Sequence, residues 1–222
     1  GWTALMGASK KGNDKLVKLL IDNGADVNLK DNSGRTALMW ATGDNKIDVV
    51  RILMSHDADA NIKTKREIPP LVLAAEKGYA EIVEAMLEKG ADIEITDVDG
   101  MTALMAASHH GNKIIMKMLM DRGASVNADA SHRSTPLIEA SRTGEKDAVA
   151  ALLNKGAEVN LRDWEEKTAL MRAAEGGFED IVRLLLDNGA KKGMKDRYGY
   201  NAMKCTDNEN IKRMLRKASK VR

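Results

Sequence analysis

The chain has 222 residues, of which 43% are hydrophobic and only 3% aromatic, so it can bury a core built from aliphatic side chains and methionine. Its net charge of +2 lacks the strong basic excess expected of a dedicated nucleic-acid binder. No run of about 18 apolar residues is present that could span a membrane, and the single cysteine, Cys205, excludes an internal disulfide and a cysteine-based zinc site.

One short pattern recurs every 33 residues from the first residue of the chain. It reads GWTALMGASKKG in the first copy, GRTALMWATGDN in the second and GMTALMAASHHG in the fourth, and no insertion interrupts the spacing. A fixed period of this length is typical of architectures in which each unit buries its apolar face against its neighbours. The sequence therefore predicts six repeats and a C-terminal cap, which cover residues 1–33, 34–66, 67–99, 100–132, 133–165, 166–198 and 199–222.

Each repeat is expected to begin with a short helix. A threonine stands where its hydroxyl can cap the free N–H groups of this helix, and Pro70 and Pro136 fall at the first helical position, where no N–H is needed. Glycines such as Gly12 and Gly78 follow the helix and can end it in the left-handed conformation. The capping threonines are Thr3, Thr36, Thr102, Thr135 and Thr168.

A second helix and an extended hairpin arm complete each repeat. In the first copy the helix has apolar residues between Leu16 and Ile21 and ends before Gly24, and ADVNLKDNSG follows as the arm. In the second copy Asn45 and Asp57 replace two helix-ending glycines, and we expect both in the left-handed region, which Asn and Asp tolerate. The sixth copy ends AKKGMKD in place of ADVNLKD, so we expect its arm to be distorted.

The last segment is expected to close the stack. Ile211, Met214 and Leu215 have helical spacing, which predicts a capping helix with a solvated basic face. Residues 211–222 carry six basic and no acidic side chains. Attachment to an anionic membrane or to nucleic acid through this segment is therefore the alternative.

This layout resembles the ankyrin repeat, whose signature T-P-L-H-x-A, glycine, second helix and NGADVN it matches in six consecutive copies. The resemblance implies an all-α repeat solenoid of stacked helix-turn-helix units with β-hairpin-like loops, in a single domain over residues 1–222. In the family a histidine of the signature joins the hairpin arms by hydrogen bonds. Here Met6, Met39, Val72, Met105, Ile138 and Met171 replace it, so we expect packing alone to join the arms. The family's asparagines are expected to serve the hairpin turn, and here they are Asn28, Asn127 and Asn160.

The resemblance implies a non-enzymatic scaffold that binds a protein or an extended peptide on a concave face lined by the first helices and hairpin arms. We expect a monomer that needs no cofactor or metal and binds no nucleic acid, and the single cysteine favours an intracellular, cytoplasmic location. By position, partner contacts come from the hairpin tips and the exposed side of the first helices. The candidates are Arg35, Trp40, Lys65, Arg66, Leu73, Met101, His109, His110, His132, Arg142, Trp164, Arg172, Tyr198 and Tyr200.

The few aromatic residues concentrate at these positions. Of the seven in the chain, five lie at hairpin tips or on the exposed side of a first helix, namely Trp2, Trp40, Trp164, Tyr198 and Tyr200. Folding alone gives no reason to expose rings in a chain that otherwise avoids them, and Trp, Tyr and Arg are frequent anchors of protein interfaces. The alternative is structural: Trp40 wedges between adjacent first helices, and Trp2 covers the end of the stack.

His109 and His110 raise the question of a metal site, since His132 lies at the next hairpin tip. Adjacent helical residues point about 100° apart, and no carboxylate or cysteine completes a ligand set, so partner contact with pH sensitivity is favoured. The recurring methionines are expected to fill the core. No catalytic motif appears. The start at Gly1 indicates a fragment, which leaves the targeting arm of a larger enzyme and an engineered binder as further possibilities.

Overall fold

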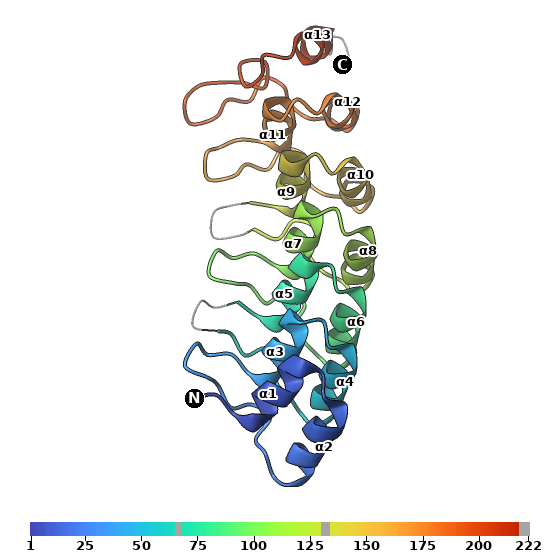
Figure 1. Ribbon diagram of the computed structural model, residues 1–222. Helices are drawn as coiled ribbons and strands as arrows, with labels where there is room; N and C mark the ends of the chain where they lie inside the picture. Colours follow the sequence, from blue (N-terminus) through green and yellow to red (C-terminus); the bar gives the residue numbers. More distant parts are fainter. Residues whose placement is uncertain (65–67, 130–133, 218–222) are drawn as a thin grey trace. The chain divides into compact units, whose positions relative to one another are not determined.

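The computed structural model describes residues 1–64, 68–129 and 134–217 (Figure 1). Within these ranges it contains thirteen helices and no sheet, and an isolated bridge joins Arg162 and Thr168. Contacts divide the chain into two compact units, Gly1–Ala103 and Leu104–Arg222, and each unit is described by itself.

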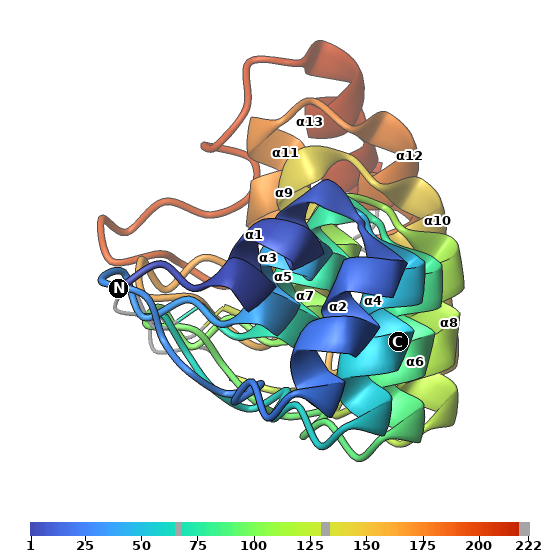
Figure 2. The same cartoon turned by 60° about the horizontal axis from the view of Figure 1, so that its bottom comes forward.

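Three helix pairs in two layers make up the first unit: α1 (Ala4–Lys11) with α2 (Asp14–Asp22), α3 (Ala37–Gly43) with α4 (Ile47–Ser55), and α5 (Pro70–Lys77) with α6 (Ala80–Glu88). In one layer α1 packs on α3 and α3 on α5, and in the other α2 packs on α4 and α4 on α6. Figure 2 shows the connecting arms leaving the first layer on the side away from α2, α4 and α6.

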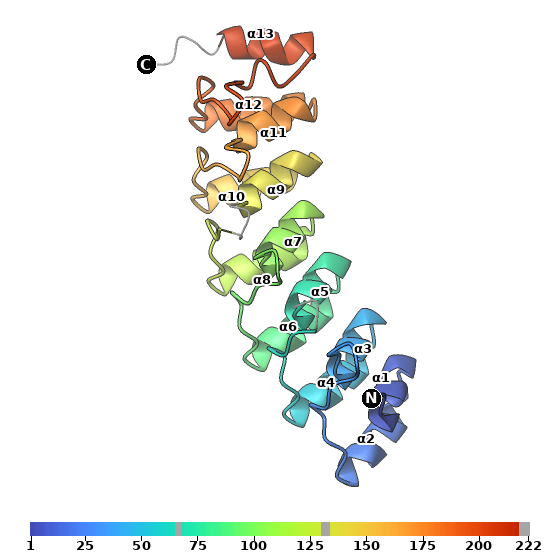
Figure 3. The same ribbon diagram turned by 90° about the vertical axis from the view of Figure 1, so that its left-hand side faces the viewer.

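The helices of the second unit are also arranged in two layers (Figure 3). Its helices are α7 (Ala103–His109), which begins at the last residue of the first unit, α8 (Lys113–Asp121), α9 (Pro136–Thr143), α10 (Lys146–Asn154), α11 (Ala169–Glu175), α12 (Glu179–Asp187) and α13 (Glu209–Lys217). α9 packs on α11, and α10 packs on both α8 and α12. The predicted class, an all-α stack of helix pairs, is confirmed.

The predicted helix ends are confirmed as well. The hydroxyl oxygen of Thr3 accepts a hydrogen bond from the Met6 N–H at 3.2 Å, and the equivalent threonines of α3, α9 and α11 do the same. Gly12 ends α1 with a φ of 72°. Asn45 and Asp57 adopt left-handed φ angles of 53° and 59°, as expected of the residues that replace glycine.

Apolar side chains at fixed repeat positions form the core between the two layers. The four methionines in the signature position are at most 3% exposed, so their predicted core-filling role is confirmed. The helices α2, α4, α6, α8, α10 and α12 each bury an apolar side chain at the same repeat position. These residues are Val17, Val50, Val83, Met116, Val149 and Val182.

Asparagines connect consecutive repeats, which corrects two expectations. The Asn28 side-chain amide donates to the Asp57 carbonyl oxygen at 3.1 Å, and its Oδ1 accepts from the Asp59 N–H at 2.8 Å. Asn160 makes the equivalent pair of bonds, and Asn127 accepts one from the following repeat. The arms are therefore joined by hydrogen bonds and not by packing alone. These asparagines serve the next repeat and not their own turn, because a side-chain amide offers both a donor and an acceptor.

Aspartates build the tips of the hairpin arms. Asp196 Oδ1 accepts from the N–H groups of Tyr198 and Tyr200 at 2.9 and 2.8 Å, and the Asp196 N–H donates to the Tyr200 carbonyl oxygen at 2.8 Å. Asp31 and Asp163 make the same bonds in their own arms. The tip of the sixth arm is therefore built as in the other arms. Residues 190–196 also follow the same sequence of turns as residues 25–31 of the first arm, so the expected distortion of this arm is wrong. The turn depends on the aspartate, which the sixth repeat keeps, and not on the altered residues before it.

Helix α13 closes the second unit against α12. Its residues Ile211 and Leu215 are buried and Met214 is half-buried, whereas Arg213 and Lys217 are exposed. The predicted helix with an apolar side on the stack and a solvated basic face is confirmed over the residues described, and its capping role stays a prediction.

Candidate functional site

Trp40 on α3 is the centre of a cluster in the first unit. Its ring meets the edge of Trp2, with centroids 4.7 Å apart and planes at 68°, and its Nε1 donates to Asp31 Oδ2 at 3.1 Å. Lys10 Nζ and Arg35 Cζ each lie 4.7 Å from the centroid of the Trp40 ring. These contacts hold the indole in one orientation with two cations beside it.

The Asp31 carboxylate links the hairpin tip to this tryptophan. Burial raises the pKa of Asp31, but hydrogen bonds from the Arg35 and Ser33 N–H groups and from the Trp40 indole lower it by more. The pKa therefore lies below the ordinary value of 3.8, and the carboxylate is ionised at neutral pH.

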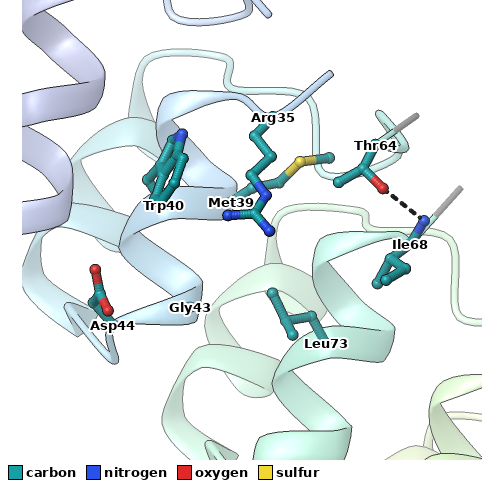
Figure 4. Close-up of a pocket in the computed structure, with 8 residues that line it drawn as sticks. All are labelled: Arg35, Met39, Trp40, Gly43, Asp44, Thr64, Ile68 and Leu73. Atoms are coloured by element: carbon teal, nitrogen blue, oxygen red, sulfur yellow. Dashed lines mark hydrogen bonds between the residues drawn. The ribbon is translucent and has the colours of Figure 1, made fainter. Parts of the chain in front are cut away.

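A hollow of about 240 Å³ lies next to Trp40, between α3 and α5 (Figure 4). Figure 4 shows the Arg35 guanidinium pointing into it, between Trp40 and Ile68 and toward Leu73. Neither Arg35 nor Lys10 is ion-paired with a carboxylate in the part of the chain that the structure describes. The lining residues are Arg35, Met39, Trp40, Gly43, Asp44, Thr64, Ile68 and Leu73.

Two neighbouring hairpin tips in the second unit present aromatic side chains. Trp164, Tyr198 and Tyr200 are 51%, 64% and 50% exposed. Arg197 joins the two tips, because its N–H donates to the Glu165 carbonyl oxygen at 3.0 Å and its guanidinium lies 5.3 Å from the centre of the Trp164 ring. One surface of this unit thus carries three rings and a cation.

Arg172 of α11 pairs with two carboxylates of the preceding hairpin tip and one of its own helix. Its Nε donates to Asp163 Oδ2 at 2.7 Å, and its terminal nitrogens donate to Glu165 at 2.6 Å and Glu175 at 3.2 Å. Burial raises the pKa of Glu165, but the hydrogen bond and the charge of Arg172 lower it by more, so it lies below the usual value. A partner that binds Arg172 therefore competes with three carboxylates for its guanidinium.

A buried carboxylate joins His109 to Arg142. Glu139 on α9 is only 5% exposed, and its Oε2 accepts from Arg142 at 2.6 Å and from His109 Nδ1 at 2.9 Å. Its Oε1 accepts from the Ser134 hydroxyl at 2.6 Å. Burial raises the pKa of Glu139, but these hydrogen bonds lower it by more. A terminal nitrogen of Arg142 also lies 3.1 Å from His109 Nδ1. Because the ionised Glu139 oxygen can only accept, we assign the His109 proton to Nδ1, which then donates to Glu139 and does not accept from Arg142.

The remaining predicted residues are dispersed. Leu73 lines the hollow, Met101 is half-buried, and His110 is exposed with its ring edge against His109, at 4.8 Å between centroids. Three other predicted residues lie outside the part of the chain that the structure describes. They are Lys65, Arg66 and His132.

The structure thus brings predicted residues together in three places: at the hollow of the first unit, at the aromatic tips of the second unit, and around Glu139, which joins His109 to Arg142. Arg35, Trp40 and Leu73 meet at the hollow, whereas the exposed rings gather at the tips of the second unit. Sequence reasoning missed Asp31 and Asp163, which position them. The available signal was the recurrence of aspartate at the same place in four repeats.

Two further properties concern the described residues. No group of three or more His, Cys, Asp or Glu side chains in the described ranges is placed to hold a metal ion. No helix in those ranges combines the length and the apolar character needed to cross a bilayer.

Comparison with known proteins identifies the family. The family described as "Ankyrin repeats (3 copies)" matches residues 1–66, 71–163 and 128–196. The human ASB11 ankyrin repeat domain is similar over 100% of both chains, with 24% sequence identity and a TM-score of 0.88. The ankyrin repeat domain of Bcl-3, described as a unique member of the IkappaB protein family, is similar over 97% of this chain and 99% of that one, with 27% identity and a TM-score of 0.84. No curated protein matches the sequence. Because the family match covers most of its length, the chain belongs to the ankyrin repeat family.

Proposed function

We propose that the chain is a non-enzymatic module that binds a protein or an extended peptide through its first helices and hairpin tips, the surface expected to be concave. Ankyrin repeats are typically protein-protein interaction modules, and the comparisons identify repeats and no catalytic domain in this chain. The choice of a protein over a nucleic acid follows from the near-balanced charge. The cytoplasmic location inferred from the single cysteine stays a prediction.

The observation that carries this proposal is the group of exposed rings on two adjacent tips of the second unit. Trp164, Tyr198 and Tyr200 each leave half or more of their surface in solvent. The tips do not need these rings to form, because Asp163 and Asp196 make the turns through backbone N–H groups. Aromatic anchors of this kind typically contribute about 2 kcal/mol or more to an interface when a partner buries them.

Quantitative affinity capture tests the proposal. The immobilised chain and its Trp164→Ala, Tyr200→Ala double variant are exposed to the same cell extract, and the captured proteins are quantified by mass spectrometry. The matched control is Ile114→Ala, which removes an apolar side chain that is 72% exposed on α8, away from the tips. We expect the double variant to capture at least about tenfold less of the specifically bound proteins than the unchanged chain. The control should capture the same amount as the unchanged chain.

Thermal melting of the three proteins separates binding from folding. We expect equal melting temperatures, because the substituted rings are outside the core. Equal capture by the double variant and the control contradicts the proposed surface. A lower melting temperature of the double variant alone shows instead that the rings stabilise the tips.

A further inference from the structure

The hollow beside Trp40 has the size of one side chain. Its volume of about 240 Å³ lies below the range of about 300 to 1,000 Å³ that is usual for small-molecule sites. Met39, Ile68 and Leu73 form its apolar walls, and all of them belong to the first unit. A single large apolar side chain of another molecule fits this space and these walls.

One cation lines this hollow and a second lies on the Trp40 ring beside it, and neither forms an ion pair in the described part of the chain. The first is Arg35, which also contacts the Trp40 ring, and the second is Lys10. The positive charge of Arg35 helps to lower the pKa of the nearby Asp31 carboxylate. The Asp31 oxygens, however, accept hydrogen bonds from the Ser33 and Arg35 backbone N–H groups and the Trp40 indole, and not from the Arg35 guanidinium. The Arg35 guanidinium therefore keeps its donors available for an outside acceptor.

Asp44 gives the hollow a negative end. It follows the last residue of α3, and Figure 4 shows it beside Gly43, apart from the Arg35 guanidinium. A carboxylate on a ligand is attracted at the Arg35 end and repelled at the Asp44 end. The two charges thus favour one direction of an extended ligand over the other.

We propose that this hollow takes a large apolar side chain of a linear acidic peptide, whose neighbouring carboxylate pairs with Arg35. The inference rests on the proposed function and names the class of partner at one site. An apolar pocket supplies affinity, and an unpaired arginine at its edge supplies the charge preference. Single-stranded nucleic acid also suits a tryptophan flanked by cations. Here, however, Lys10, Arg35 and Trp2 already contact the ring that a base has to stack on.

Peptide selection tests the inference. A phage-displayed library of random linear peptides is selected on the full chain, and binding of the most enriched peptide is measured by fluorescence anisotropy. The site variants are Arg35→Gln and Leu73→Gln. The matched control is Arg51→Gln, which removes an exposed arginine from α4 of the same unit. Melting curves of all variants show whether each is folded, and Arg35→Gln alters only an exposed side chain.

The inference predicts that enriched peptides share an acidic residue next to a large apolar one. Arg35→Gln and Leu73→Gln then weaken binding about tenfold or more, and Arg51→Gln leaves it unchanged. When the acidic residue of the peptide is replaced by its amide, Arg35→Gln no longer has an effect, because the pair it removes is already absent.

Three outcomes overturn it. Enriched peptides that need no acidic residue, or that bind Arg35→Gln as tightly as the unchanged chain, show that the hollow is not the site. Failure to enrich any peptide shows that no linear peptide is its ligand. Binding of fluorescent oligothymidylate that exceeds peptide binding and is lost in Arg35→Gln assigns the cations to nucleic acid. In the first two cases affinity capture with the Trp164 and Tyr200 variants decides separately whether the proposed function stands.

Discussion

Single aspartates determine how the candidate binding residues are held. Asp31 and Asp163 occupy the same place in their repeats, and each accepts a hydrogen bond from the side chain nine residues further on. In the first unit that side chain is Trp40, whose indole is thereby anchored beside the hollow. In the second unit it is Arg172, whose charge is thereby drawn toward the tip and away from solvent. An aspartate at the same repeat position thus holds an aromatic ring in one repeat and pairs with an arginine in another.

Glu139 gives a pH-dependent contribution to stability. Burial raises its pKa, but hydrogen bonds from Ser134, Arg142 and His109 hold it below the ordinary 4.5. The folded chain therefore binds fewer protons at this carboxyl than the unfolded chain does in acid. The stabilisation is fully present above the unfolded pKa, and it is lost as the pH falls through the lower folded pKa.

We expect Glu139→Gln to show this in urea unfolding measured at a series of pH values. Above about pH 5 the variant has a lower free energy of unfolding than the unchanged chain, by about 1 to 3 kcal/mol, because a buried charged acceptor is removed. Below the ordinary pKa of 4.5 the difference shrinks. A difference that stays constant down to pH 3 contradicts the assigned role. Glu76→Gln, on an exposed site of α5, is the control and should change nothing.

At the scale of helices and arms, features made by sequence neighbours could be predicted and features made across repeats could not. The caps of α1 depend on Thr3 and Gly12, which bond within a few residues, so the sequence was sufficient. The bonds of Asn28 reach residues 29 and 31 positions away, and their partners are backbone groups that no sequence pattern marks. The prediction that the sixth arm is distorted was based on its altered residues AKKGMKD. The turn depends instead on Asp196, which this arm retains.

The candidate site shows the same division. The repeat position predicted that Trp164 and Tyr198 lie at hairpin tips, and the structure leaves both more than half exposed. It did not predict that Arg172 and Arg142 pair with Asp163 and Glu139, because a repeat position places a side chain on a face without naming its neighbours. The hollow beside Trp40 likewise needs two repeats to form, so neither repeat alone predicts it.

Two glycines that end helices provide a matched test of local packing. Gly144 after α9 and Gly156 after α10 both have a φ of 85°, so alanine is strained at either position. A Cβ at Gly144 comes within 2.6 Å of the Phe178 ring, whereas a Cβ at Gly156 meets no atom within 4 Å.

We expect Gly156→Ala to lower the free energy of unfolding by about 1 to 2 kcal/mol through backbone strain alone. Gly144→Ala should lower it by at least about 1 kcal/mol more, since the Phe178 ring has to move. Urea unfolding followed by circular dichroism measures both values. If both variants lose the same free energy of unfolding, the Phe178 ring moves without an energetic penalty and only the backbone strain destabilises the chain.

At the scale of the whole molecule, a stack of repeats has to end in an element that covers the last apolar face. In this chain α13 covers the apolar side of α12, and no first helix precedes it, since residues 201–208 contain only turns, a bend and irregular backbone. Ile211 and Leu215 are buried on α12, and Lys192 Nζ donates to the Leu215 carbonyl oxygen at 2.6 Å. The apolar side of this helix therefore serves the fold, and only its basic side is available for attachment to an anionic surface.

Two variants of α13 separate capping from attachment. Truncation after Asp207 removes the buried Ile211 and Leu215, each of which contributes about 1.5 to 3 kcal/mol of burial, so we expect a clearly lower melting temperature. Arg213→Gln with Lys217→Gln removes two exposed charges and leaves the apolar side intact, so the melting temperature should hardly change. Sedimentation with phosphatidylserine vesicles then measures the effect of the two charges on membrane binding, because the second variant is folded.

If the unchanged chain binds the vesicles and this variant does not, α13 attaches the chain to an anionic surface in addition to covering α12. If neither protein binds, the basic side of α13 only keeps this helix solvated.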